Sequence, residues 1–129
     1  MAFRASLKFE GQNYDVLECN YSFRRDVDLK GRPSSNVYGG NIIIEVESTE
    51  DTKIIAQMVN QFKPCNGTII FNKGDEEAKM KEVVWQNGYI IDYRESLDVI
   101  GREPMKIYFV VSAEKIKVEG TEVDHKWPK

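Results

Sequence analysis

The sequence contains one histidine, two cysteines and no long hydrophobic run. His125 has no partner at metal-ligand spacing, so a metal site and histidine-based catalysis are disfavoured. No apolar stretch approaches the roughly 20 residues of a membrane-spanning helix. The first residues, MAFRASLKF, alternate apolar and polar side chains, unlike the core of a signal peptide. We therefore expect a protein that is made in the cytoplasm and at first stays there, without a metal or a cofactor.

Charge of neither sign dominates the chain. The 129 residues carry 18 Lys and Arg against 21 Asp and Glu, a formal net charge of -3, and the two signs are interspersed. This charge distribution lacks the basic patch that binding to nucleic acid or to an anionic membrane would require. The length fits a single globular domain over residues 1–129.

Two cysteines without an export signal are expected to stay reduced. Cys19 alternates in step with Leu17, Tyr21 and Phe23, which predicts a core thiol on one face of a strand. Cys65 lies in the loop PCNG, and its exposure stays open.

Patterns that could carry catalysis are weak. Ser112 and Lys115 match the S-x-x-K string of serine acyl-enzymes, but that motif works from the start of a helix and this copy ends a strand. Glu45 and Glu47 point to one side of a strand and could imitate a catalytic carboxylate pair, yet a hydrated strand face explains them without any catalyst. No glycine-rich phosphate loop is present in the sequence. An enzyme is disfavoured, and no catalytic, cofactor-binding or metal-ligating residue is assigned.

Alternation with a period of two dominates the chain and predicts strands. Residues 3–9 and 14–23 are expected to form a hairpin, and residues 41–47 a third strand. Asn87-Gly88 predicts a two-residue hairpin turn, because both positions of a type I′ turn favour positive φ. The remaining strands are expected at residues 68–71, 79–86, 89–96, 105–112 and 115–118.

One segment has helical spacing instead. Over residues 50–62 apolar side chains recur at helical intervals, which predicts a helix that buries one stripe. Ser48 or Thr49 is expected to cap its first turn, and Pro64 prevents its continuation. The packing stripe is expected to contain Ile55, Met58, Val59 and Phe62.

One helix among about eight strands predicts a mainly β fold, a barrel or sandwich of antiparallel strands with one helix packed on it. The strand at residues 105–112 is apolar on both faces, since Val110 and Tyr108 alternate with Ile107 and Phe109. An antiparallel sheet in a monomer usually leaves one face to water. A helix covers only part of the outer face, so the pattern indicates self-association.

The segment GRPSSNVYGG, residues 31–40, is too long for an ordinary connection between two strands. Its Gly, Pro, Ser and Asn residues disfavour a helix and a central strand. Val37 and Tyr38 are unusual choices for a loop that only touches water. The length of this loop needs a reason beyond connection.

Four stretches resemble the tube protein of type VI secretion systems, the Hcp family in its TssD branch. They are RDVDLKGRPSS, VYGGNI, VESTED and MKIYFVVSAEKIK. The resemblance implies a small β-barrel with a flanking helix that forms hexameric rings. The rings stack into a tube inside a contractile sheath, which expels the tube into another cell. The implied partners are further copies of the chain, the sheath, spike and baseplate proteins, and effectors carried in the lumen, with export that needs no signal peptide.

The resemblance also gives the long loop a role, because residues 25–40 match a loop that reaches onto a neighbouring subunit and helps rings to stack. Its charges and apolar side chains are of the kind that interfaces use. The implied contact residues are Arg25, Asp26, Val27, Asp28, Arg32, Pro33, Ser34, Ser35, Val37 and Tyr38. The alternative for this loop is a passive surface connection.

Two other functions stay open. A tail-tube protein of a phage or of another contractile injection device would share the same mechanics. A monomeric β-barrel that binds a small ligand would not assemble at all.

Overall fold

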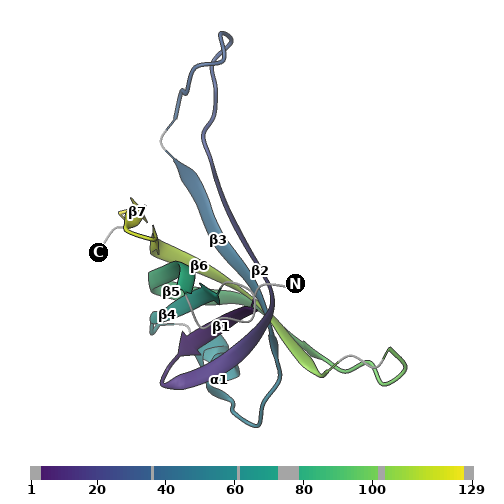
Figure 1. The fold of residues 1–129 in the computed structure, drawn as a ribbon. Coiled ribbons are helices and arrows are strands. Elements are labelled where there is room, and N and C mark those ends of the chain that lie inside the picture. The colour runs from purple at the N-terminus through teal and green to yellow at the C-terminus, as the bar shows by residue number, and fades with distance from the viewer. Residues whose placement is uncertain (1–3, 36, 61, 73–78, 102–103, 127–129) are drawn as a thin grey trace.

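The structure, a computed structural model, describes residues 4–35, 37–60, 62–72, 79–101 and 104–126. These residues form seven strands and one helix (Figure 1). In chain order they are β1 (Arg4–Phe9), β2 (Gln12–Arg24), β3 (Tyr38–Glu47), α1 (Lys53–Val59), β4 (Cys65–Asn72), β5 (Lys79–Ser96), β6 (Lys106–Val118) and β7 (Thr121–Asp124).

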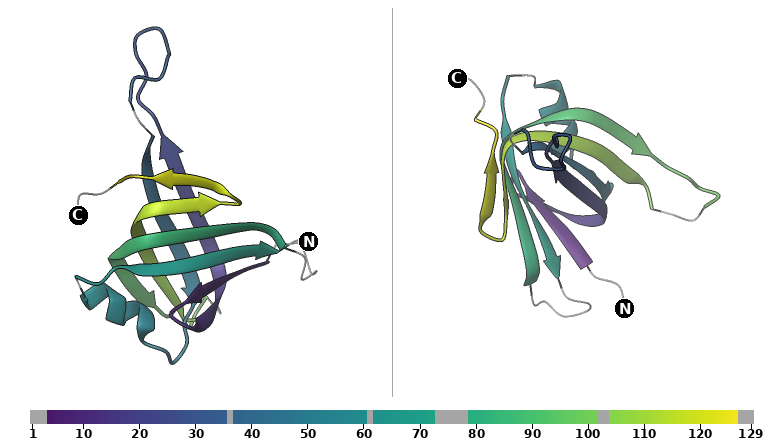
Figure 2. Two further views of the ribbon diagram at one scale, coloured as in Figure 1. Left: turned by 90° about the vertical axis from the view of Figure 1, so that its left-hand side faces the viewer. Right: turned by 90° about the horizontal axis from the view of Figure 1, so that it is seen from above.

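The strands pair antiparallel in one sheet of order β3-β2-β1-β4-β5-β6-β7. An additional antiparallel pairing of β3 with β6 closes the first six strands into a barrel, and β7 extends the sheet beyond β6. The left view of Figure 2 shows the helix at one end of this barrel and the long β2–β3 connection at the other. The predicted mainly β fold, a barrel with one flanking helix, is confirmed.

The barrel interior is filled by large apolar side chains from every strand of the barrel. Trp85 lies fully buried in it, with its ring centroid 6.1 Å from that of Phe9. Gly67 and Gly88 make room for the indole, because a Cβ built on either would lie within 2.6 Å of the Trp85 ring. The other fully buried large side chains are Leu7, Ile42, Ile44, Val46, Ile54, Ile69, Val83, Ile107, Phe109 and Ile116.

The prediction of a hairpin turn at Asn87-Gly88 was wrong, since β5 runs unbroken through these residues. Asn87 does adopt positive φ, at 53°, but within a β-bulge against β4. Its backbone N–H donates to Oδ1 of Asn66 at 2.9 Å, and its Nδ2 donates to Oε1 of Glu114 at 2.9 Å. Asparagine suits positive φ in a bulge as it does in a turn, so the local signal did not distinguish the two.

The tight turns lie elsewhere. Glu10-Gly11 joins β1 to β2 and Glu119-Gly120 joins β6 to β7, each with two successive positive φ values. The predicted strands at residues 105–112 and 115–118 are one strand, β6, and β7 was not predicted.

The helix is shorter than predicted and begins differently. It starts at Lys53, and no side chain caps it through Ser48 or Thr49. Thr49 Oγ1 instead accepts the N–H of Asp51 at 3.2 Å, and Asp51 Oδ1 accepts the N–H of Lys53 at 2.9 Å. These side chains form local turns before the helix, the arrangement that short polar residues favour outside helices.

The packing face of α1 also differs from the predicted stripe. Ile54 is 1% exposed and Met58 is partly buried against the core, whereas Ile55, Val59 and Phe62 are exposed. A helix of seven residues has about two turns, so one i, i+4 pair is all that it presents to the barrel. The outer face of the helix is therefore apolar and uncovered in the single chain.

The alternation of β2 changes phase at Leu17. Val16 pairs with Val46 and Glu18 with Glu45, so β2 holds one extra residue there. This bulge turns Leu17 outward, contrary to the prediction, and lets Cys19, Tyr21 and Phe23 pack on the core after it.

Candidate functional site

The connection between β2 and β3 projects from one end of the barrel as an arm (Figure 1). We call residues 25–37 the first arm. Its base continues the β2–β3 ladder, in which Phe23 pairs with Gly39 and Arg24 with Tyr38. The prediction that the third strand starts at residue 41 was wrong, since residues 38–40 already belong to β3 and follow β2 there. Gly40 accommodates the bulge there with φ at 84°.

The first arm is held by its own hydrogen bonds. Val27 and Pro33 form an isolated antiparallel bridge, and the N–H of Ser34 donates to the carbonyl of Asp26 at 2.8 Å. At the tip, Asp28 Oδ1 accepts the backbone N–H groups of Lys30 and Arg32, each at 2.9 Å. The arm is thus an ordered small hairpin, with its polar backbone largely satisfied within itself.

The ten predicted contact residues all lie on this arm or at its base. Asp28 and Arg32 were expected to offer their charges to a neighbour. Instead, Arg32 Nε lies 3.5 Å from Asp28 Oδ2, and the two side chains form an ion pair on the surface. Val37 is partly buried and, with Arg25, lines a hollow beside β7 that includes Glu122 and Asp124. The position of the Tyr38 side chain lies outside what the structure describes.

The sequence reasoning missed Leu29, which is fully exposed at the tip of the first arm. Val27 is exposed beside it. An apolar residue in the turn sequence DLKG was the signal that could have identified Leu29, because a turn that only faces water favours polar residues.

A second arm projects from the barrel where β5 turns into β6 (Figure 1). We call residues 97–101 the second arm. Leu97, Val99 and Ile100 are 60–95% exposed, and Asp98 Oδ1 accepts the N–H of Gly101 at 3.0 Å. The sequence reasoning did not single out this segment, although three apolar residues in LDVIG were visible.

Four strands form a sheet that reaches beyond the barrel, in the order β2-β3-β6-β5. Pairing of β1 with β2 ends at Asp15, and pairing of β4 with β5 ends at Gly88. Within the described residues, no strand pairs with the outer edge of β2 over residues 17–23 or of β5 over residues 90–96. The sheet thus has one open edge on each side.

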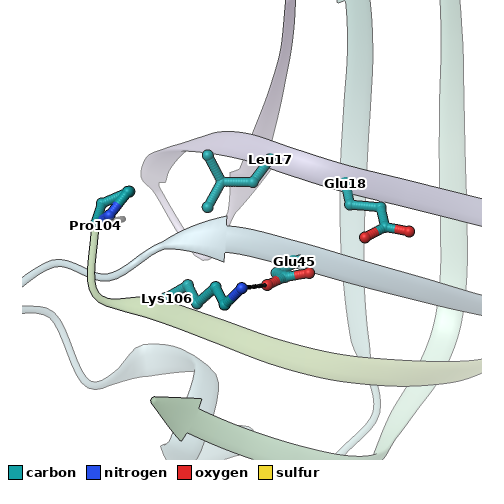
Figure 3. A pocket seen from close by; sticks show the side chains of 5 residues that line it. All are labelled: Leu17, Glu18, Glu45, Pro104 and Lys106. Carbon is teal, nitrogen blue, oxygen red and sulfur yellow. Dashed lines mark ion pairs between the residues drawn. The ribbon is translucent and has the colours of Figure 1, made fainter. Parts of the chain in front are cut away.

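The outer face of this four-stranded sheet carries both charge and apolar surface. Lys106 Nζ lies 2.9 Å from Glu45 Oε1 across β3 and β6, in a shallow hollow that Leu17, Glu18 and Pro104 also line (Figure 3). The guanidinium of Arg94 lies 4.8 Å from the ring centroid of Tyr108. Side chains of the same sheet therefore cover part of the apolar outer face of β6.

The described part of the chain offers few candidate residues for catalysis or metal binding. No group of three or more His, Cys, Asp or Glu side chains there could hold a metal ion. No helix among these residues is long and apolar enough to cross a membrane.

Both thiols are free, and burial raises the pKa of each to about 11. Cys65, whose exposure was left open, is buried at the start of β4, where its Sγ lies 3.3 Å from the carbonyl oxygen of Gly88.

The chain is similar in sequence or in fold to several proteins of known structure. Hcp1 from Flavobacterium johnsoniae is 37% identical and superposes with a TM-score of 0.87, over 94% of this chain and 98% of that chain. An Hcp1 protein from E. coli superposes at 0.73 with 11% identity, over 96% and 98%. A chain of the PVC sheath-tube complex, from an extracellular contractile injection system in its extended state, superposes at 0.54 with 13% identity, over 89% and 87%. The last two likenesses are of fold alone.

No curated protein matches the sequence. The family model described as hemolysin coregulated protein Hcp (TssD) matches residues 1–128. That match spans the barrel, both arms and the helix, and the Flavobacterium protein shares the same architecture over nearly its whole length. The chain therefore belongs to the hemolysin coregulated protein Hcp (TssD) family.

Proposed function

We propose that the chain is the tube subunit of a type VI secretion system and that six copies close into a ring. The observation that carries this proposal is the pair of open strand edges on the β2-β3-β6-β5 sheet. Unpaired edges attract further strands, so two uncovered edges on one sheet favour pairing with a partner on each side.

The strand directions favour a head-to-tail ring. β2 is antiparallel to β3, β3 to β6, and β6 to β5, so directions alternate across the sheet. A neighbouring β2 placed beside β5 continues the alternation and makes an antiparallel pair. Each copy then uses two different edges, so the interface is heterologous. Such an interface closes into a ring if a whole number of copies completes a full turn. The number six rests on the family.

The first arm is proposed to link one ring to the next. It projects at one end of the barrel, and α1 lies at the other (Figure 2). Leu29 and Val27 offer apolar contacts at its far end, and its internal hydrogen bonds keep it ordered before contact. An arm that is ordered in advance loses less conformational entropy when it binds.

The outer face of the four-stranded sheet is proposed to line the lumen. Glu18, Glu45 and Lys106 give this face charges of both signs, with which an effector could be carried. Sheath, spike and baseplate proteins are the further partners, and the tube leaves the cell through the machine itself.

The tail tube of another contractile injection device shares these mechanics, and the likeness to the PVC complex fits it. The family match favours the type VI system. A monomeric ligand-binding barrel is less compatible, because Trp85, Phe9 and Phe109 fill the barrel interior.

Negative-stain microscopy of the purified protein, joined to light scattering, tests the proposal. We expect rings with an open centre and a mass of several subunits. A mass near 14.9 kDa at every concentration would contradict it.

A further inference from the structure

We propose that the second arm of each copy docks on the exposed outer face of α1 in the neighbouring copy of the same ring. This inference rests on the proposed function, because it needs a ring of identical chains. It names two surfaces that β4 and β5 separate in the sequence, the arm at residues 97–101 and the outer side of α1 formed by Ile55 and Val59 together with Phe62 just beyond the helix.

The arm carries apolar surface that the single chain leaves in water. Ile100 is 95% exposed, and Leu97 and Val99 are exposed beside it. Asp98 holds the turn through the N–H of Gly101, so these side chains are presented on an ordered tip. A cluster of exposed aliphatic side chains on a projecting hairpin is typical of a docking element.

The helix face is a matching acceptor. Ile55 and Val59 are four residues apart on α1, which places them on one side of the helix, and Phe62 follows shortly after the helix ends. Their exposed fractions are 41%, 75% and 84%. Ile54 and Met58 already attach the helix to its own barrel, so the outer stripe is free for a second copy.

The register of the sheet brings these two surfaces to the same end. Ser96 pairs with Lys106, Lys106 with Glu47, and Val46 with Val16, so the end of β5 is level with the start of the open edge of β2. From there β2 leads back to the β1–β2 turn. The Nζ of Lys53 in α1 donates to the carbonyl of Glu10 in the β1–β2 turn at 2.7 Å, which fixes the start of the helix near that level.

A neighbouring β2 laid beside β5 therefore places its own β1–β2 turn and α1 next to the second arm. The first arm is excluded from this contact within a ring, since it lies at the opposite end of the barrel (Figure 2).

Charges of opposite sign occur among the residues beside the two apolar patches. Asp98 lies within the arm and Glu95 at the end of β5 before it, whereas Lys63 follows Phe62 and Lys53 begins the helix. Opposite charges at the rim of an apolar contact favour the correct pairing of surfaces and speed their encounter.

Ile100→Asp tests the arm, because this side chain is exposed and its change should leave the barrel folded. We expect the protein concentration at half assembly to rise about tenfold or more in light scattering, the effect of losing a central apolar contact. Met80→Asp, an exposed apolar position near the start of β5 and outside both surfaces, is the matched control and should assemble normally.

Adding Val59→Lys to Ile100→Asp supplies the decisive measurement. A ring places each new aspartate near a new lysine on the next copy, so the double variant should recover a substantial part of the lost assembly. A photo-crosslinking residue at position 100 should also join the arm to residues 53–63 of another chain, as mapped by mass spectrometry. Rings that form normally with Ile100→Asp, or crosslinks that map elsewhere, would overturn the inference and leave the proposed function standing. A wild-type protein that stays monomeric would overturn both.

Discussion

Gly67 of β4 lies directly opposite Trp85 of β5, and the absence of a side chain on the glycine is what admits the indole ring. A Cβ at Gly67 would lie 2.2 Å from Cη2 of Trp85. The largest side chain of the core is thus positioned by the smallest residue on the neighbouring strand, and the contact lies between two strands of a closed barrel that leaves the ring little room to move.

Gly67→Ala should therefore destabilise the fold. Overpacking a core typically costs about 1–3 kcal/mol, and here the neighbour is a rigid ring with no alternative space. Urea unfolding should show a lower midpoint with an unchanged slope. Lys81→Ala, an exposed change on the adjacent strand, serves as the control. Equal midpoints for the two variants would mean that the indole shifts without cost.

The two neighbouring isoleucines of α1 should respond differently to truncation. Ile54→Ala removes a side chain that is 1% exposed and should lower the free energy of unfolding by about 2–5 kcal/mol. Ile55→Ala alters the outer face and should change it by less than about 1 kcal/mol. Thermal or urea unfolding of the two variants at low protein concentration, where assembly does not contribute, decides the matter. A larger loss of stability for Ile55→Ala would show that the helix packs on the barrel through Ile55 and not through Ile54.

The thiols should be slow to react in the folded protein. Burial raises the pKa of Cys19 and of Cys65 from an ordinary value near 9 to about 11, so the nucleophilic thiolate is scarce at pH 8. Ellman's reagent should modify both slowly in buffer and both rapidly in urea. Cys65→Ala should leave one slow thiol.

The same shift predicts a loss of stability in alkali. The folded pKa values lie above the unfolded ones, so the thiol contribution is fully present below pH 9 and is lost as the pH rises towards 11. Cys65→Ala should flatten this part of the stability profile when its unfolding is measured between pH 8 and 11. An unchanged profile would assign the alkaline loss to other groups.

Removal of the first arm should spare the barrel and impair assembly. The bridge and the tip of the arm are held by hydrogen bonds within the arm, so a short Gly-Ser turn in place of residues 27–35 should leave the free energy of unfolding within about 0.5 kcal/mol of the wild-type value. Electron microscopy should show rings with fewer and shorter stacks. Leu29→Asp, which keeps the length of the arm, should have the same effect in milder form. A variant with the shortened arm that stacks normally would reduce the arm to a passive connector.

The sequence predicted a mainly β fold because period-two alternation is a property of single strands, and most strands of the barrel keep it. The choice of a barrel over a sandwich came from the family resemblance. The prediction failed where pairing with neighbouring strands determines whether a residue lies in a strand or a turn, and which face it occupies. Asn87-Gly88 has the composition of a turn, yet β4 and β6 flank it and their ladders carry β5 straight through. Leu17 was assigned to the core face because a bulge that inserts one residue is invisible in the alternation of one strand.

The surfaces proposed for assembly were predictable only in part. The first arm was visible as an excess of turn residues, and its family resemblance gave it a role. The open edges of β2 and β5 were not visible, since they depend on where the partner strands stop, at Asp15 and at Gly88. The exposed stripe of α1 was mistaken for its buried stripe because helical spacing alone does not say which of two apolar faces meets the barrel.

Closure of the barrel by β3 and β6 has a consequence for how the chain folds. In sequence the two strands are separated by α1, β4 and β5, so their ladder is among the last that a growing chain can form. On the ribosome, the edge of β3 that pairs with β6 cannot be covered by that strand until most of the chain has emerged. Such non-local pairing places folding in a range of about milliseconds to seconds. During that interval the exposed strands are open to capture by another nascent chain, and newly made protein should depend on chaperones more than its small size suggests.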